Sequence, residues 1–243
     1  MSMDTWFEAG HVAIVTGGSR GLGKALAREL LLRGVQTIVD GRDPGALETT
    51  RKELSGLGDL ITIAGDVADR RHVRALIDAA QRFGRLDLLV NNASTLGAVP
   101  LPAVVQLSRD VLERLFAVNL FGPTALMGEA VALMRANDRL GTIVNVTSDA
   151  AVETYPGWAG YGSTKAALEH VSRVLAAELA DGAIRVLVAD PGDMDTQMHR
   201  DAIPDADPAQ LRHPADAARA LLVAIASMQQ PYERIRLAAL VGA

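Results

Sequence analysis

Tyr161 and Lys165 are the residues whose types and spacing most directly indicate chemistry in this sequence. They lie four residues apart, where the glycine-rich stretch 157–162 leads into an apolar-periodic segment at 166–180. In a helix this spacing places both side chains on one face, one turn apart and within reach of one reacting group. An ammonium beside a phenol favours the phenolate, so we expect the pKa of Tyr161 to fall from its ordinary value of about 10 toward neutral pH. The pair predicts general acid–base chemistry, although a tyrosine four residues before a lysine also occurs by chance on helix surfaces.

The segments that must position this pair alternate along the chain. Short runs rich in Val, Ile and Leu predict strands, and longer amphipathic segments between them predict helices. The expected strands are 12–16, 35–40, 60–64, 86–90, 142–146, 184–189 and 235–240, and the expected helices are 22–33, 45–57, 70–83, 108–135, 161–180 and 215–228. This alternation predicts an α/β fold, a Rossmann-like doubly wound parallel sheet of about seven strands with helices on both faces. No linker interrupts it, so we expect residues 1–243 to form one domain.

Composition excludes several classes of function. The chain has 243 residues, 49% of them hydrophobic, a net charge of −5 and no cysteine. Thiolate chemistry and disulfides are therefore excluded, and a nucleic-acid partner is disfavoured. Acidic residues near the start of the chain do not fit a signal peptide, and no long apolar run predicts a membrane span, so we expect a cytoplasmic protein. We predict no metal site, because metal-ligand spacing is absent among His11, His72, His170, His199 and His213.

The junction after the first expected strand is rich in glycine. Gly17, Gly18, Gly21 and Gly23 fall between strand 12–16 and helix 22–33. Glycines at such a junction allow a tight turn, a close approach of a phosphate to the backbone, and dense packing of helix on strand. The free amides at the start of the helix would then face a pyrophosphate. The simpler alternative is an ordinary glycine-rich turn.

Taken together, these stretches resemble the short-chain dehydrogenase/reductase family from about residue 12 to about residue 225. The resemblance rests on motifs in the family's order and at its intervals: TGGSRGLG at 16–23, Asp66-Val67, Asn91-Asn92-Ala93, Asn119, Ser148 thirteen residues before Tyr161-x-x-x-Lys165, and PGDMDT at 191–196. It implies an NAD(P)-dependent oxidoreductase that interconverts a carbonyl and an alcohol.

The resemblance also implies roles for individual residues. Tyr161 is expected to be the general acid/base, and Ser148 to polarise the substrate oxygen. Lys165 is expected to hold the nicotinamide ribose hydroxyls, and Asn119 to hold a water that links the lysine to solvent. Independently of the family, Pro123 lacks an N–H and leaves the carbonyl of Asn119 without its helical partner, so the helix should be irregular there.

The choice of dinucleotide depends on the end of the second strand. Asp40 is a candidate acid for a ribose 2′-hydroxyl, whereas Arg20 and Arg42 suit a 2′-phosphate. On the family pattern, the acid that selects NAD falls at Gly41, so we predict NADP(H), with NAD(H) as the alternative. The full set of expected cofactor contacts is Gly17, Ser19, Arg20, Gly21, Leu22, Gly23, Arg42, Asp66, Val67, Asn92, Ala93, Ser94, Thr147, Tyr161, Lys165, Pro191, Gly192, Met194 and Thr196.

Three further features concern the substrate and the assembly. The polar segment 193–212 is expected to be a helix-poor, mobile lid over the substrate. Trp158, near Tyr155 and Tyr161, is interpreted either as a pocket wall or as a packing residue. The helices 108–135 and 161–180 are expected to pair between copies in a homodimer or homotetramer. Ser94 stands where the family usually has glycine, and the C-terminus departs from the family pattern.

The resulting hypothesis is an NADPH-dependent carbonyl reductase acting on a small molecule, with no nucleic-acid or membrane partner. The alternative is a catalytically silent, NADP-binding sensor or scaffold of the same fold, since fold alone does not determine activity.

Overall fold

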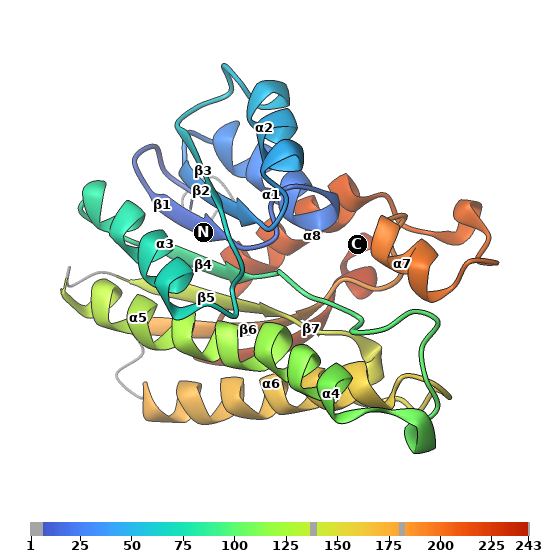
Figure 1. Ribbon diagram of the computed structural model, residues 1–243. Helices are drawn as coiled ribbons and strands as arrows, with labels where there is room; N and C mark the ends of the chain where they lie inside the picture. The colour runs from blue at the N-terminus through green and yellow to red at the C-terminus, as the bar shows by residue number, and fades with distance from the viewer. Residues whose placement is uncertain (1–6, 137–139, 180–182, 243) are drawn as a thin grey trace.

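The computed structural model describes residues 7–136, 140–179 and 183–242 (Figure 1). Seven strands form one sheet in the order β3-β2-β1-β4-β5-β6-β7, and every neighbouring pair is parallel. The strands are β1 (Val12–Val15), β2 (Gln36–Gly41), β3 (Leu60–Ala64), β4 (Leu88–Asn91), β5 (Gly141–Val146), β6 (Ile184–Asp190) and β7 (Tyr232–Arg236). The predicted doubly wound parallel sheet is confirmed.

Helices cover both faces of this sheet (Figure 1). They are α1 (Gly21–Leu31), α2 (Pro44–Glu53), α3 (Arg70–Arg82), α4 (Arg109–Phe116), α5 (Gly122–Ala136), α6 (Ala159–Glu178), α7 (Gln197–Ala202) and α8 (Pro214–Ser227). The central strands are apolar along their length because both faces are buried; all four residues of β1 are inaccessible. One core packs α1, α2 and α8 on the sheet, and a second packs α3, α5 and α6 on its opposite face.

Local sequence signals account for several helix starts. The Asp43 carboxylate caps α2 by accepting hydrogen bonds from the backbone N–H groups of Gly45 and Ala46, and Pro44 occupies the first turn. Asp69 caps α3 in the same way through the Arg71 N–H. By contrast, α1 begins at Gly21, and the residue before it, Arg20, provides no side-chain cap, so the first amides of the helix lack a side-chain acceptor.

The predicted helix 108–135 is interrupted before Pro123. A π-helical turn, Ala117–Phe121, separates α4 from α5, and the Gly122 N–H bonds to the carbonyl of Ala117. The irregularity expected near Asn119 is therefore a π-helical turn, which is wider than an α-helical turn. The span Arg109–Ala136 is long and apolar enough to cross a membrane by length and composition alone, but half of its apolar window is buried inside the protein. That burial is typical of a core helix.

Two expectations from sequence are wrong in detail. The last strand is Tyr232–Arg236, not 235–240, and residues Leu237–Gly242 form a 3₁₀ helix. The prediction followed the apolar run at 235–240. The strand that forms, β7, is instead an edge strand with a half-buried, polar sequence, and it pairs with β6 from Tyr232 onward. The segment 193–212 contains α7 and a 3₁₀ turn, so it is not without helix. The helix expected over residues 161–180 would end at residue 180, which lies outside the described residues.

Candidate active site

Two adjoining cavities lie at the carboxyl edge of the sheet, where parallel α/β folds place their sites. The larger, of about 1010 Å³, is lined by the loops after β1, β2, β3 and β4 and by the segment after β6. The smaller, of about 130 Å³, lies between the ends of β5 and β6, the start of α6, and α7. Asn92, Ser94, Leu96, Met194, Thr196 and Met198 line both.

The glycine-rich turn forms one wall of the larger cavity. Gly17 has a φ of +68°, and a Cβ there would lie 2.9 Å from the Ala93 Cα, while a Cβ on Gly23 would collide with the carbonyl oxygen of Gly17. Asn92 holds the turn from β4 by donating from its Nδ2 to the carbonyl of Thr16 at 2.7 Å. The turn therefore accepts only glycine at these two positions, and it presents the uncapped start of α1 to the cavity.

Asp40 does not offer its carboxylate to a ribose. The side chain is 1% exposed; Oδ1 accepts a hydrogen bond from the Gly17 N–H at 2.6 Å, and Oδ2 contacts His72 Nε2 at 2.8 Å. Both oxygens are thus engaged in holding the glycine-rich turn to β2 and α3. Each oxygen keeps a second lone pair, but its burial leaves little access for a ribose 2′-hydroxyl.

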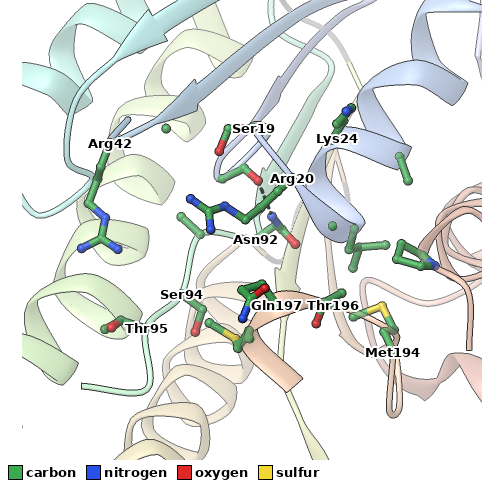
Figure 2. Close-up of a pocket in the computed structure, with 18 of the residues that line it drawn as sticks. Ser19, Arg20, Lys24, Arg42, Asn92, Ser94, Thr95, Met194, Thr196 and Gln197 are labelled. Atoms are coloured by element: carbon green, nitrogen blue, oxygen red, sulfur yellow. Dashed lines mark hydrogen bonds between the residues drawn. The ribbon is translucent and has the colours of Figure 1, made fainter. Parts of the chain in front are cut away.

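Arginines supply positive charge at the same end of the cavity. Arg20 and Arg42 extend toward the space in front of the glycine-rich turn (Figure 2), and neither has an ion-pair partner among the described residues. Asp66 lies close by and binds Arg114 at 2.6 Å. Burial alone would raise the pKa of Asp66, but hydrogen bonds from the Ala68 N–H and Arg114, with the charges of Arg114 and Arg42, hold it below its ordinary value.

Ser148, Tyr161 and Lys165 line the smaller cavity together. Ser148 follows β5, and the other two residues lie in the first turns of α6. Lys165 is 2% exposed; its Nζ lies 5.5 Å from the centroid of the Tyr161 ring and donates to the Val146 carbonyl at 2.8 Å. That carbonyl is the ammonium's one hydrogen-bond partner among the described residues, which leaves donors for a ligand.

The pKa of Tyr161 is shifted in the direction opposite to our sequence-based prediction. Burial raises it to about 12; hydrogen bonding with Ser94 lowers it, and the charges of Asp190 and Asp149 raise it. Burial likewise lowers the pKa of Lys165 to about 8. The prediction is wrong because it omitted desolvation, and because the ammonium lies over the ring rather than at the hydroxyl.

The carboxylate of Asp149 orients Ser148. The Ser148 hydroxyl donates to Asp149 Oδ1 at 2.9 Å and accepts from the Ala150 N–H. Asp149 Oδ2 accepts from the Tyr155 hydroxyl. Burial raises the pKa of Asp149, but the hydrogen bonds from Ser148, Tyr155 and Ala150 outweigh it, so the net shift is downward. Asp190 ends β6 nearby, and burial raises its pKa, with the charge of Asp149 adding to the increase.

Asn119 lies behind the cavities and lines neither. Its Oδ1 accepts from the Ser94 hydroxyl and the Thr95 N–H, and its Nδ2 donates to the Thr95 carbonyl and the Thr164 hydroxyl. Ser94, which also hydrogen-bonds with Tyr161, therefore connects Asn119 to the phenol. The water expected at Asn119 stays a prediction.

An apolar wall closes the smaller cavity. Trp158 contacts Tyr161 edge to face, with ring centroids 5.6 Å apart, and contacts Tyr155 in the same way. Both interpretations of Trp158 therefore hold, since it packs on these rings and also lines the cavity. Leu96, Met198 and Ala202 complete the wall.

Most of the residues expected to bind a cofactor line one of these cavities. The larger is lined by Gly17, Ser19, Arg20, Gly21, Leu22, Arg42, Asp66, Val67, Asn92, Ala93, Ser94, Met194 and Thr196, and the smaller also by Thr147, Tyr161, Lys165, Pro191 and Gly192. Gly23 lines neither and serves packing. Sequence reasoning missed Leu96, Asp149 and Asp190 as lining residues, and it covered Met198 and His199 only through the expected lid segment 193–212. Only Asp149, directly after Ser148, carried a local signal.

A family model described as short chain dehydrogenase matches residues 11–207. The chain belongs to the short-chain dehydrogenase family. A member from Saccharomyces cerevisiae, a benzil reductase that forms (S)-benzoin, is 34% identical over 197 residues, covering 79% of this chain and 74% of the yeast protein. The family assignment makes the protein an oxidoreductase, in agreement with the resemblance seen in its sequence.

Solved structures of short-chain dehydrogenases share the fold over nearly the whole chain. A 7α-hydroxysteroid dehydrogenase complexed with NADH and 7-oxo glycochenodeoxycholic acid has a TM-score of 0.85 at 26% identity, covering 97% of this chain and 96% of that one. A short-chain dehydrogenase from Burkholderia cenocepacia in complex with NADP has a TM-score of 0.83 at 26% identity, covering 95% and 97%. Because both dinucleotides occur among such structures, a nicotinamide dinucleotide follows from the family, but the choice between the two does not.

Proposed function

We propose that this short-chain dehydrogenase interconverts a ketone or aldehyde and its alcohol, using NADP(H) and Tyr161 as general acid/base. The observation that supports this most is the convergence of Ser148, Tyr161 and Lys165 on one small cavity with an apolar wall. We further propose that the substrate is a small molecule and that the protein works in the cytoplasm.

The residues of the larger cavity fit a dinucleotide. The turn at Gly17 and Gly23 has no room for side chains, and the start of α1 is uncapped, which suits a pyrophosphate. Arg20 and Arg42 have no anionic partner among the described residues and suit a 2′-phosphate. The Asp40 carboxylate, which could hold the ribose 2′-hydroxyl of NAD(H), is instead buried against Gly17 and His72. These features support NADP(H) over NAD(H).

The chain's own residues supply the proton chemistry. A nicotinamide cofactor, when bound, would supply the hydride in reduction and take it up in oxidation. The raised pKa of Tyr161 keeps its phenol protonated at neutral pH, which is the form that can donate a proton to a carbonyl oxygen. Ser148 would donate a hydrogen bond to the same oxygen after turning from Asp149. The free donors of Lys165 would hold cofactor hydroxyls, and the nearby ammonium would stabilise the phenolate as the proton leaves.

The test is Tyr161→Phe, assayed by consumption of NADPH with a panel of ketones, quinones, steroids and acyl thioesters. We expect activity to fall at least about a hundredfold, because general acid catalysis contributes that much or more. Binding of NADPH, measured by fluorescence titration, should stay within about twofold. Unchanged turnover in the variant would refute the mechanism, and a wild type that binds NADPH but reduces nothing would favour the sensor or scaffold alternative.

The cofactor assignment has its own test. Replacing Arg20 and Arg42 by alanine should raise the KM for NADPH at least about tenfold and leave the KM for NADH nearly unchanged, because only the phosphate contacts are lost. Arg51→Ala, an exposed arginine paired with Glu48 on α2, is the matched control. A wild type with higher kcat/KM for NADH than for NADPH would overturn the assignment.

A further inference from the structure

Ser94 places a hydroxyl in the site at a position where the family usually has glycine. It follows β4, is half-buried and lines both cavities (Figure 2). Its Oγ lies 3.1 Å from Asn119 Oδ1, and it also forms a hydrogen bond with Tyr161. The mechanism proposed above does not use this hydroxyl.

Backbone groups of Thr95 determine which atom of Asn119 faces Ser94. The Thr95 N–H donates to Asn119 Oδ1 at 2.9 Å, and Asn119 Nδ2 donates to the Thr95 carbonyl at 2.9 Å. Because a backbone N–H can only donate and a carbonyl can only accept, the amide of Asn119 cannot be reversed. Oδ1 is therefore an acceptor, and the hydrogen of the Ser94 hydroxyl points to Asn119 in the free protein.

With that hydrogen engaged, Ser94 Oγ faces Tyr161 as an acceptor. Burial raises the pKa of Tyr161 to about 12, so the phenol is protonated at neutral pH and can donate to Ser94. In this arrangement Tyr161 donates to Ser94, and Ser94 donates to Asn119. Asn119 Nδ2 also donates to the Thr164 hydroxyl at 3.1 Å, and that hydroxyl donates to the Tyr161 carbonyl at 2.7 Å. These bonds connect the loop after β4 to the first turns of α6.

The Ser94 hydroxyl can change its acceptor without leaving Asn119 unsatisfied. If Ser94 turns toward Tyr161, Asn119 Oδ1 still accepts from the Thr95 N–H. A phenolate oxygen is a better acceptor than a neutral amide oxygen, because charge-assisted hydrogen bonds are roughly twice as strong as neutral ones. Loss of the Tyr161 proton therefore favours the orientation in which Ser94 donates to the phenol oxygen. In agreement, burial raises the pKa of Tyr161 and the hydrogen bond with Ser94 opposes that increase.

We propose that Ser94 is a positioning residue for Tyr161, and that its hydroxyl turns from Asn119 to the phenol oxygen as the Tyr161 proton passes to the substrate oxygen. Ser94 keeps its own proton throughout, so the proton that reaches the substrate is the one from Tyr161. A glycine at this position would supply no such donor. This inference rests on the proposed function and adds to it a residue that stabilises the phenolate.

The experiment measures kcat for alcohol oxidation as a function of pH, at saturating oxidised dinucleotide and alcohol. The alcohol is the product of whichever panel ketone the wild type reduces. Oxidation uses the phenolate as the base, so kcat should rise with pH through the pKa of Tyr161 in the complex. Ser94→Ala and Ser94→Gly remove the donor and should raise this apparent pKa by about one unit, the size expected for one hydrogen bond to a charged group. Reduction at pH 7 should slow about tenfold in both variants for the same reason.

Two further variants connect the shift to the hydroxyl. Ser94→Thr keeps an O–H and should restore the apparent pKa to near the wild-type value. Ser163→Ala is the matched control, because the Ser163 hydroxyl donates to the Gly160 carbonyl of its own helix at 2.9 Å and Ser163 lines neither cavity. It should leave the pH profile unchanged. Because kcat is measured at saturation, a change in cofactor affinity does not enter the comparison.

Other titratable groups also face Tyr161, and the variants leave them in place. The groups that line the smaller cavity with it are carboxylates, an imidazole and an ammonium: Asp149 after β5, Asp190 at the end of β6, Asp193 and His199 in the segment that carries α7, and Lys165 on α6. The charges of Asp190 and Asp149 raise the pKa of Tyr161 in all of these proteins. A difference between the profiles of two variants at residue 94 therefore belongs to that residue.

The outcomes separate this inference from the function on which it rests. Profiles of Ser94→Ala and Ser94→Gly that coincide with the wild type, or that are lower at every pH without a shift, would overturn the role of Ser94 alone, since a structural defect lowers the rate without moving the apparent pKa. A shift that Ser94→Thr shares would also overturn it, because the hydroxyl would not be the cause. A wild type that neither reduces any ketone of the panel nor oxidises any of the corresponding alcohols would overturn the proposed function and this inference with it.

Discussion

Burial shifts the pKa values of Tyr161 and Lys165 in opposite directions, because it disfavours the charged form of each group. The phenol is held neutral and the ammonium becomes easier to deprotonate. At neutral pH the Tyr161 phenol is thus protonated and can donate to a carbonyl oxygen. The Lys165 ammonium beside it is buried and incompletely solvated. The free protein bears the free-energy cost of that cation, which a bound ligand would reduce by accepting its spare hydrogen bonds.

The cost at Lys165 predicts how stability changes with pH. Its pKa is about 8 in the folded chain, against about 10.4 in an unfolded one, so between these values the unfolded state binds more protons and stability rises with pH. Below pH 8 the full cost is present. We therefore expect Lys165→Met to unfold at higher free energy than the wild type at pH 7 in the absence of cofactor, by up to about 3 kcal/mol.

The measurement is urea unfolding of both proteins at pH 7 and pH 9. The advantage of the variant should shrink by about 1 kcal/mol over this interval, because the wild type gains stability as Lys165 loses its proton. Lys52→Met, at a side chain that is 72% exposed, should show no such pH-dependent difference. A Lys165→Met protein that is less stable than the wild type at pH 7 would show that the ammonium is fully solvated or fully paired.

A residue's place in the site can be predicted from sequence when nearby residues determine it, and not when packing against distant elements does. The helix period alone relates Tyr161 to Lys165, whereas Ser148 was singled out by the resemblance to the family, which places a serine at that interval before the tyrosine. Asp40 could not be assigned, because the same β2 end could present its carboxylate to a ligand or to Gly17, and the choice depends on His72 from α3. His199 lies in the expected lid segment 193–212, but its burial could not be predicted because it arises from packing of α7 on distant elements.

At the scale of elements, the central strands and the helices around them were predictable because their apolar patterns are set by burial on both faces. The exceptions lie where burial is partial. The edge strand β7 is polar, so the prediction placed the last strand too late in the chain, on the apolar residues that follow β7. The π-helical turn before Pro123 was expected only as an irregularity, because the missing N–H permits several rearrangements.

Asp40 joins three elements, the glycine-rich turn, β2 and α3, so it gives an element-scale prediction. Asp40→Asn should lower the free energy of unfolding by about 1 to 3 kcal/mol, because an amide has one acceptor oxygen and cannot replace both carboxylate oxygens, which contact the Gly17 N–H and His72 Nε2. The KM for the dinucleotide should rise several-fold as the turn loses its anchor. Chemical unfolding and steady-state kinetics measure the two effects.

Asp59→Asn is the matched control for this prediction. Asp59 is exposed directly before β3, and its carboxylate accepts a surface hydrogen bond from the Gln36 side chain at 3.2 Å, so the substitution should change stability by no more than about 0.5 kcal/mol. An Asp40→Asn protein that keeps both wild-type stability and cofactor affinity would show that the neutral amide can replace the carboxylate.

At the scale of the whole molecule, the parallel sheet gathers into one edge residues that lie far apart in the chain. Gly17 follows β1, Asp40 lies in β2, Asn92 follows β4 and Ser148 follows β5, and all reach the two cavities because parallel strands end at the same edge. Helices α4, α5 and α6 lie on the face of the sheet opposite α1, which follows the glycine-rich turn (Figure 1). This face is therefore free to serve assembly.

That face carries apolar side chains in solvent, which leads to the last prediction. Phe121 is 60% exposed in the π-helical turn and Val174 is 43% exposed on α6. We predict that these helices pair between copies, giving a particle of two or four times 25.7 kDa in light scattering coupled to gel filtration. Phe121→Glu and Val174→Glu should each shift the particle toward 25.7 kDa, because association would bury an unpaired charge. Val105→Glu, at a residue that is 94% exposed outside these helices, should leave the mass unchanged. A monomeric wild type at micromolar concentration, or dissociation caused by Val105→Glu but by neither helix variant, would place any contact between copies elsewhere.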